Sequence, residues 1–135
     1  MDKVMRIDTE GRITLEAYPK RSSGEQLRWM YDQIGCDMIE IVHPRYLPGF
    51  SMVVDESGLI RKNPIANKIA SMVYGYMDHG QVIAGNVLIM SEKLTPHGAE
   101  LCGLNDTGIA VVISMLQQQG LMPKGAGRIE LHSAK

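Results

Sequence analysis

Residues 22–43 read SSGEQLRWMYDQIGCDMIEIVH, and this stretch contains the clearest helix-to-strand transition in the chain. Ser22 and Glu25 have the spacing of a capping box, which predicts that a helix starts here. The apolar residues that follow are spaced by three and four positions and so form one face of that helix: Leu27, Met30, Tyr31 and Ile34. Gly35 is typical of the position just past a helix end, and the apolar run at 38–43 predicts a strand. We therefore expect a helix that packs on a sheet.

The rest of the chain continues this alternation of strands and helices. Residues 4–7 and 12–18 predict a β-hairpin, because apolar and polar residues alternate on either side of a turn at Gly11. Further strands are predicted at 50–55, 59–61 and 81–90, further helices from Asn63 and from 105–107, and a polar loop at 91–103. This order predicts an α+β fold, a mixed and mostly antiparallel sheet of roughly five to six strands with about three helices, mostly on one face.

Length and composition limit the class of protein. The 135 residues fit one domain, which we place at 1–122, followed by a C-terminal tail or arm at 123–135. The formal net charge of −1 argues against a nucleic-acid binder, which normally carries a basic excess. Two cysteines, Cys36 and Cys102, are too few for a disulfide scaffold or a four-cysteine zinc site. The start of the chain has no signal-peptide pattern and the longest apolar stretch, 109–116, cannot span a bilayer, so we expect a cytoplasmic protein without a membrane partner.

No pattern in the sequence predicts catalysis. The four histidines lack metal-binding spacing, the serines lack a nucleophile elbow, and neither phosphate-binding glycine motif is present. Cys36 follows a helix C-terminus and precedes Asp37, and both features raise the pKa of a thiol. We therefore expect no catalytic residue, metal or cofactor. The alternative is a small enzyme acting on a nucleotide or phosphate ester with His43 or His97 as general base, although the sequence supplies no orienting partner for either histidine.

Cations gather where the second helix is predicted to start. Arg61 and Lys62 precede the predicted cap Asn63, and Lys68 lies one turn inside the helix. Free N–H groups and the helix dipole make such an N-terminus receptive to phosphate or carboxylate. These four residues are therefore candidates for binding a small anionic ligand. The plainer interpretation is that Asn63 caps its helix and the cations are solvated.

Two further positions are candidates for binding. Arg45 and Tyr46 lie in a loop between two prolines, where a ring and a guanidinium could stack on a base or hold an anion. Trp29 falls outside the apolar stripe of its helix, which favours a surface for a partner. The alternative for Trp29 is a wide helix face that the tail partly buries.

Four blocks of sequence, taken together, resemble one family. Residues 27–42 resemble its block LQ…VGGYIEVV, residues 55–66 resemble DEEGL…NPRA, residues 82–89 resemble IVGDVLI, and residues 104–106 resemble the helix start GLTDE. The family is the phage- and plasmid-associated domain-of-unknown-function family 3846, and the resemblance extends over residues 3–120. The chain departs from the family pattern at Cys36 and Asp37. It also has Ile65 where arginine is common, which weakens any anion site inferred from the family.

The resemblance implies a setting rather than a chemistry, because the family has no agreed activity. It implies a protein of a phage, prophage or mobile element, in the cytoplasm of a bacterial host cell. With no catalytic set in the sequence, we expect a non-enzymatic binding protein, and a homo-oligomer, that counters host defence. It would sequester a small anionic, nucleotide-like ligand or block a host defence protein. A structural phage protein without a ligand is a further alternative.

Overall fold

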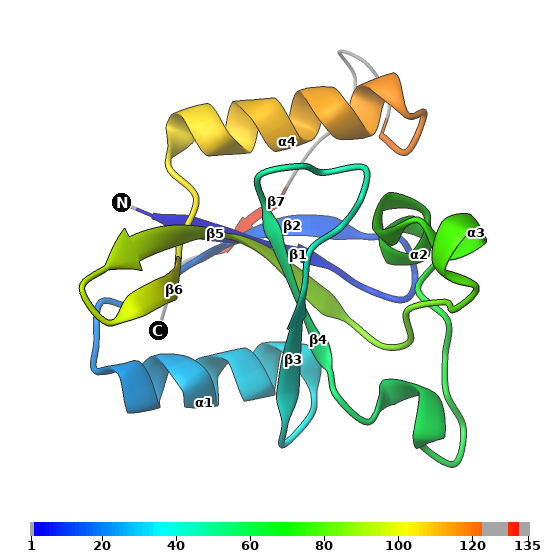
Figure 1. Cartoon of the computed structure of the whole chain (residues 1–135), viewed down its shortest axis with the longest axis horizontal. Coiled ribbons are helices and arrows are strands. Elements are labelled where there is room, and N and C mark those ends of the chain that lie inside the picture. Colours follow the sequence, from blue (N-terminus) through cyan, green and yellow to red (C-terminus); the bar gives the residue numbers. More distant parts are fainter. Residues whose placement is uncertain (1, 123–129, 133–135) are drawn as a thin grey trace.

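The protein is described here by a computed structural model that covers residues 2–122 and the backbone of 130–132 (Figure 1). Six strands form a sheet in the order β3-β4-β5-β1-β2-β7, and every pairing is antiparallel except that of β2 with β7. The strands are β1 (Lys3–Ile7), β2 (Ile13–Ala17), β3 (Ile39–Val42), β4 (Ser51–Asp55), β5 (Val87–Thr95), β6 (Gly98–Cys102) and β7 (Glu130–His132). The helices are α1 (Ser23–Ile34), α2 (Lys68–Tyr74), α3 (Tyr76–His79) and α4 (Asp106–Gln118), with a 3-10 turn at Gly58–Ile60. The predicted α+β fold is confirmed.

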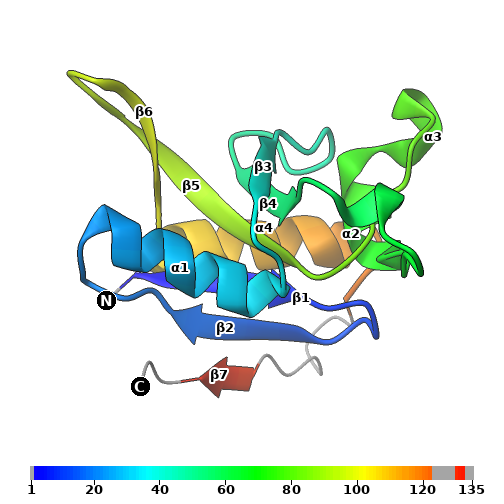
Figure 2. The ribbon, with the colours of Figure 1, turned by 90° about the horizontal axis from the view of Figure 1, so that it is seen from below.

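Helices cover both faces of the sheet (Figure 2). α2 and α4 pack on one face, where their buried residues Ala70, Val73, Val112 and Leu116 join Met5, Ile7, Met52 and Ile89. α1 packs on the other face, where Met30 and Ile34 join Val4, Val53, Leu88 and Met90. Because successive strand residues point to opposite faces, a strand covered on both sides is apolar throughout. This explains the uninterrupted apolar run at the start of β5.

Three segments differ from their predicted structure. Residues 59–61 contribute to a 3-10 turn instead of a strand. The strand predicted from residue 81 begins at Val87, because Ala84 before it forms only an isolated bridge with Ala66. The predicted polar loop at 91–103 is a hairpin of β6 with the second half of β5. That hairpin has no buried face along most of its length, so its sequence lacks the apolar alternation that identifies strands.

The predicted cap of the second helix is also wrong: α2 begins at Lys68, and its cap is Asn67 instead of Asn63. The Asn67 side chain is completely buried. Its oxygen accepts a hydrogen bond from the Ala70 N–H at 3.0 Å, and its amide nitrogen donates to the carbonyls of Ile7 and Gly85, both at 3.0 Å. Asn67 therefore caps the helix and also ties it to the sheet, which the exposed Asn63 cannot do.

β7 forms the other edge of the sheet from β3. The backbone of Glu130–His132 pairs in parallel with Thr14–Glu16 of β2. Apart from this strand, the tail predicted at 123–135 lies outside the described residues.

Candidate functional site

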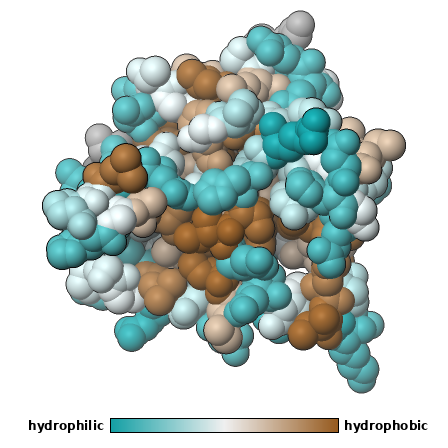
Figure 3. All heavy atoms as spheres, viewed as in Figure 1, coloured by the Kyte–Doolittle hydropathy of each residue, from teal (hydrophilic) through white to brown (hydrophobic). Residues whose placement is uncertain are grey.

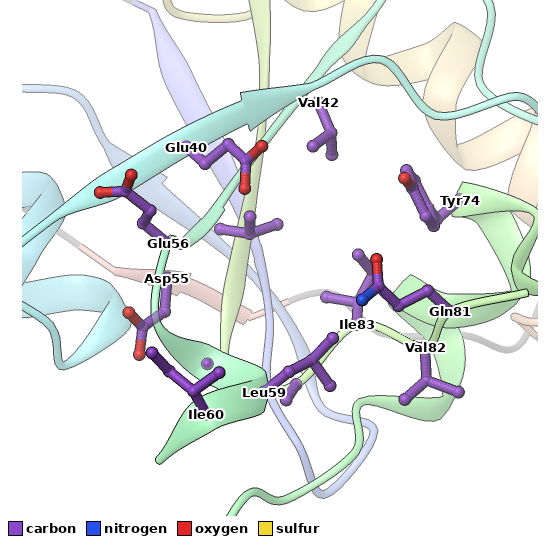
Figure 4. Close-up of a pocket in the computed structure, with 13 residues that line it drawn as sticks. Glu40, Val42, Asp55, Glu56, Leu59, Ile60, Tyr74, Gln81, Val82 and Ile83 are labelled. Carbon is purple, nitrogen blue, oxygen red and sulfur yellow. The ribbon is translucent and has the colours of Figure 1, made fainter. Parts of the chain in front are cut away.

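A groove of about 230 Å³ opens beside the outer strands β3 and β4 (Figure 4). Its walls come from the 3-10 turn on one side and from the end of α2 with residues 81–84 on the other. The lining residues are Glu40, Val42, Val54, Asp55, Glu56, Gly58, Leu59, Ile60, Tyr74, Gln81, Val82, Ile83 and Ala84. The groove thus unites segments that lie far apart in the sequence.

Much of the groove surface is apolar. Val42, Val54 and Ile83 belong to, or pack on, the core cluster beneath it. Leu59 and Ile60 stand at the opening, and Ile60 is 85% exposed. Apolar surface is visible at the lower right of Figure 3, where Figure 1 places this 3-10 turn. Val82 on the facing wall is exposed as well, and a group of exposed apolar side chains around a groove is typical of a binding surface.

The charges around the groove are negative. Glu40 directs its carboxylate over the groove, and Asp55 and Glu56 lie at its outer rim (Figure 4). Asp55 accepts hydrogen bonds from the Ser57 N–H at 2.9 Å and from the Arg61 guanidinium, and it raises the pKa of Arg61. Among the described residues, no lysine or arginine lines the groove. The site therefore favours a cation over an anion.

Gly58 brings the 3-10 turn close enough to form the groove wall. A Cβ atom at this position would lie 2.8 Å from the Ala84 carbonyl oxygen, which belongs to the rigid backbone of the facing wall. Only glycine permits this approach, so Gly58 fixes the distance between the two walls.

Of the residues predicted to bind an anion at a helix start, only Lys68 lies at the N-terminus of α2. Arg61, Lys62 and Asn63 lie in the exposed connection before α2, and Lys68 is exposed at the first position of that helix. The Arg61 guanidinium is held by Asp55. The connection runs in extended form past Ala84 instead of entering a helix at once, and this separates Arg61 and Lys62 from the free N–H groups.

Arg45 and Tyr46 have a different carboxylate partner from Arg61. The Tyr46 hydroxyl donates to Asp78 at 3.0 Å, and the Arg45 Nε lies 3.5 Å from the same Asp78 oxygen. The guanidinium also lies 5.9 Å from the centre of the Tyr46 ring. Since Asp78 belongs to α3, this pair fastens the loop to that helix. No hydrogen bond or ion pair in the described part of the chain joins Arg45 or Tyr46 to Arg61.

Trp29 is half-buried. Its ring meets the Tyr18 ring edge to face, with centroids 5.6 Å apart, and both rings pack against the α1 side of the core. Tyr18 thus covers part of the helix face that carries Trp29, whereas the side chains of the tail, which the alternative expected to bury this face, lie outside the described residues.

A polar cluster near the base of the β5–β6 hairpin joins β4 and β5 to His43, which directly follows β3. Glu92 accepts a hydrogen bond from the buried Ser51 hydroxyl at 2.5 Å, and its carboxylate lies 2.8 Å from the His43 Nε2. The Ser51 bond, followed by the His43 bond, lowers the pKa of Glu92. His43 therefore has the carboxylate partner that its sequence context did not reveal. His97, the other candidate base, lies exposed in the hairpin turn. Its backbone N–H donates to the Thr95 hydroxyl oxygen at 3.1 Å.

The cysteines lack the features of a nucleophile. Burial, followed by the charge of Asp55, raises the pKa of Cys36. Burial is also the main cause of the raised pKa of Cys102. A thiol with a raised pKa carries little thiolate at neutral pH, as expected for Cys36 from its sequence position.

Sequence patterns missed the polar residues of the groove. Glu40 was visible only as the polar member of an alternating strand, between Ile39 and Ile41. Such a residue is ordinarily solvated, and nothing in its spacing connects it to Tyr74 or Gln81. Gly58 is the one groove residue whose type hints at a close approach of two segments, but in the sequence a glycine after Glu56 and Ser57 is also typical of an ordinary turn.

Among the side chains described, those of residues 2–122, no group of three or more potential ligands could hold a metal ion. No helix in this part of the protein is long and apolar enough to cross a membrane.

Comparison with protein families supports the resemblance found in the sequence. The family model described as a domain of unknown function (DUF3846) matches residues 1–117. Comparisons with curated proteins and with solved structures find no significant match. Since the matched residues make up most of the chain, the protein belongs to the DUF3846 family.

Proposed function

We propose that this protein is a non-enzymatic binding protein that captures a cationic and apolar segment of a partner protein. The observation that carries the proposal is the groove beside β3, which combines an apolar lining with carboxylates and no basic side chain among the described residues. A lysine or arginine of the partner would pair with Glu40 while a neighbouring apolar side chain contacts Leu59 and Val82. Such a segment complements both the apolar lining and the carboxylates of the groove.

We further propose that the partner is a host defence protein. The family resemblance implies a phage, prophage or mobile element in a bacterial cytoplasm, and in that setting the partner would be a host defence protein. Binding to the groove would block the partner by occupying its basic segment. The resemblance supports this step by association, and the groove supports only the chemical class of the segment.

Sequestration of a small anionic ligand is the other form of a binding function. Arg45 would have to leave Asp78, and Arg61 would have to leave Asp55, before either could bind the ligand. Sequestration would also require these two groups of residues to act together, although no hydrogen bond or ion pair in the described part of the chain joins them. We therefore place capture of a protein segment first.

The proposal is tested with a fluorescein-labelled peptide of alternating lysine and leucine, and with a glutamate–leucine peptide as the opposite probe. Fluorescence anisotropy should show binding of the lysine peptide alone. Glu40→Lys should weaken this binding about ten-fold, because it replaces the attracting charge with a repelling one. Asp32→Lys, the same charge change on the exposed side of α1, should leave it unchanged. Equal binding of both peptides, or equal effects of the two substitutions, would refute the proposal.

A small enzyme acting on a nucleotide or phosphate ester is the second candidate, and the His43–Glu92 pair favours it. A carboxylate that orients an imidazole is a common feature of general bases. The Ser51 hydroxyl bonds to the same carboxylate oxygen and not to His43, so the serine is not arranged as a nucleophile. The second candidate predicts turnover in a panel of nucleotides and phosphate esters that His43→Ala abolishes and His97→Ala leaves intact. No turnover by the wild-type protein would exclude this panel as its substrates.

A further inference from the structure

The hairpin arm, formed by residues 91–102, projects from the body of the protein (Figures 1 and 2). Ser91 to Thr95 pair with Gly98 to Cys102, and the Thr95 hydroxyl closes the turn by donating to the Gly98 carbonyl at 2.9 Å. Leu94, near the tip, is 90% exposed, the highest value among the large hydrophobic residues described. Ala99, opposite Leu94, is exposed as well. A two-stranded ribbon is marginally stable alone in water, so an arm of this kind gains from being covered.

The tip of the arm matches the groove in chemistry. Lys93 and Leu94 are neighbours in β5 and point to opposite faces of the strand. The groove likewise has Glu40 over it from β3 and apolar Leu59 and Val82 on its walls. A strand that enters the groove could therefore place the Lys93 ammonium near Glu40 while Leu94 contacts the apolar wall. Glu100 is opposite Lys93 in the hairpin. Its negative charge would repel the carboxylates of the groove, and so it opposes the match.

The arm is too far from the groove of its own chain. Figures 1 and 2 show the arm on one side of the protein, and α2 with the 3-10 turn, which wall the groove, on the other. Any contact between the arm and a groove must therefore join two copies of the chain.

We propose that the arm of one copy binds in the groove of the next, so that the occupant of the groove in the free protein is a second copy of this chain. The contact is head-to-tail, because it uses two different surfaces, and it builds a closed ring if the rotation between copies closes. The inference rests on the groove of the proposed function. It deepens that function, because a partner segment must displace the arm.

Native mass spectrometry of the whole chain tests the contact between arm and groove. One variant alters the arm (Leu94→Asp) and the other alters the groove (Glu40→Lys). The wild-type protein should form oligomers at high micromolar concentration. Leu94→Asp and Glu40→Lys should each be mostly monomeric at that concentration, because each should associate about ten-fold more weakly. Mixing the two variants should give a one-to-one dimer and nothing larger, since only the intact arm of Glu40→Lys and the intact groove of Leu94→Asp can meet. Glu100→Gln should strengthen association, because it removes the opposing charge.

Three results would overturn the inference: a monomeric wild-type protein, Leu94→Asp that associates as strongly as the wild type, or Glu40→Lys that does so. The lysine–leucine peptide separates this outcome from failure of the proposed function. Leu94→Asp leaves the groove unaltered, so it should bind the peptide at least as tightly as the wild-type protein, whose own arms compete. A monomeric protein that binds the peptide refutes the arm contact alone, and oligomers without peptide binding refute the proposed partner class alone.

Discussion

Replacing Asn67 with alanine is expected to lower the free energy of unfolding by about 3–5 kcal/mol, the largest effect of any substitution considered for this protein. The side chain is completely buried and makes three hydrogen bonds to backbone groups. Alanine would leave the carbonyls of Ile7 and Gly85 and the N–H of Ala70 without these bonds, two of which are buried and one, to Gly85, partly buried. Urea denaturation followed by circular dichroism measures the change.

Asn63→Ala is the matched control. The sequence pattern favours Asn63 as the cap, but the residue is exposed and lies before the helix. Its loss should change the free energy of unfolding by less than about 0.5 kcal/mol. Comparable effects of the two substitutions would contradict the assignment of Asn67 as the cap.

Replacing Gly58 with alanine is expected to destabilise the fold by about 1–3 kcal/mol and to alter the groove. The added Cβ would meet the Ala84 carbonyl oxygen at 2.8 Å, so the 3-10 turn must move away from the facing wall. Glycine is not required here by a left-handed backbone, because Gly58 is absent from the glycines with positive φ. The cost is therefore steric. Urea denaturation measures the stability, and anisotropy with the lysine–leucine peptide should show weaker binding.

Gly24→Ala is the matched control, and it should change the free energy of unfolding in the opposite direction. Gly24 lies in the first turn of α1, and a Cβ there would meet nothing within 4 Å. Alanine should stabilise the protein by about 0.5–1 kcal/mol through its higher helix propensity. If Gly58→Ala behaved like Gly24→Ala, the close contact between the two groove walls would be refuted.

Local sequence signals predicted the parts of this fold that are formed by neighbouring residues. The capping box at Ser22 and Glu25 predicted α1, and the Ser22 side chain accepts a hydrogen bond from the Glu25 N–H at 3.3 Å. Asn105 likewise predicted the start of α4 and caps it through the Gly108 N–H. In both cases the cap and the helix it serves lie within a few residues, so spacing alone identifies them.

The second helix could not be placed from its sequence, because its cap depends on distant residues. Asn63 before Pro64 has the better local pattern. Asn67 is preferred in the fold because its amide reaches Ile7 in β1 and Gly85 before β5, which are distant in sequence. Hydrogen bonds across such separations leave no periodic signal.

Residue patterns repeated within short stretches are enough to predict the α+β class, the β1–β2 hairpin, α1 and α4. Where the charges meet depends instead on the tertiary structure. It paired Arg61 with Asp55 and Arg45 with Asp78, and it brought Glu40 beside the apolar walls of a groove formed from four separate segments. The physical reason is that a carboxylate acts on whatever lies within a few ångströms of it, and chain folding sets those distances.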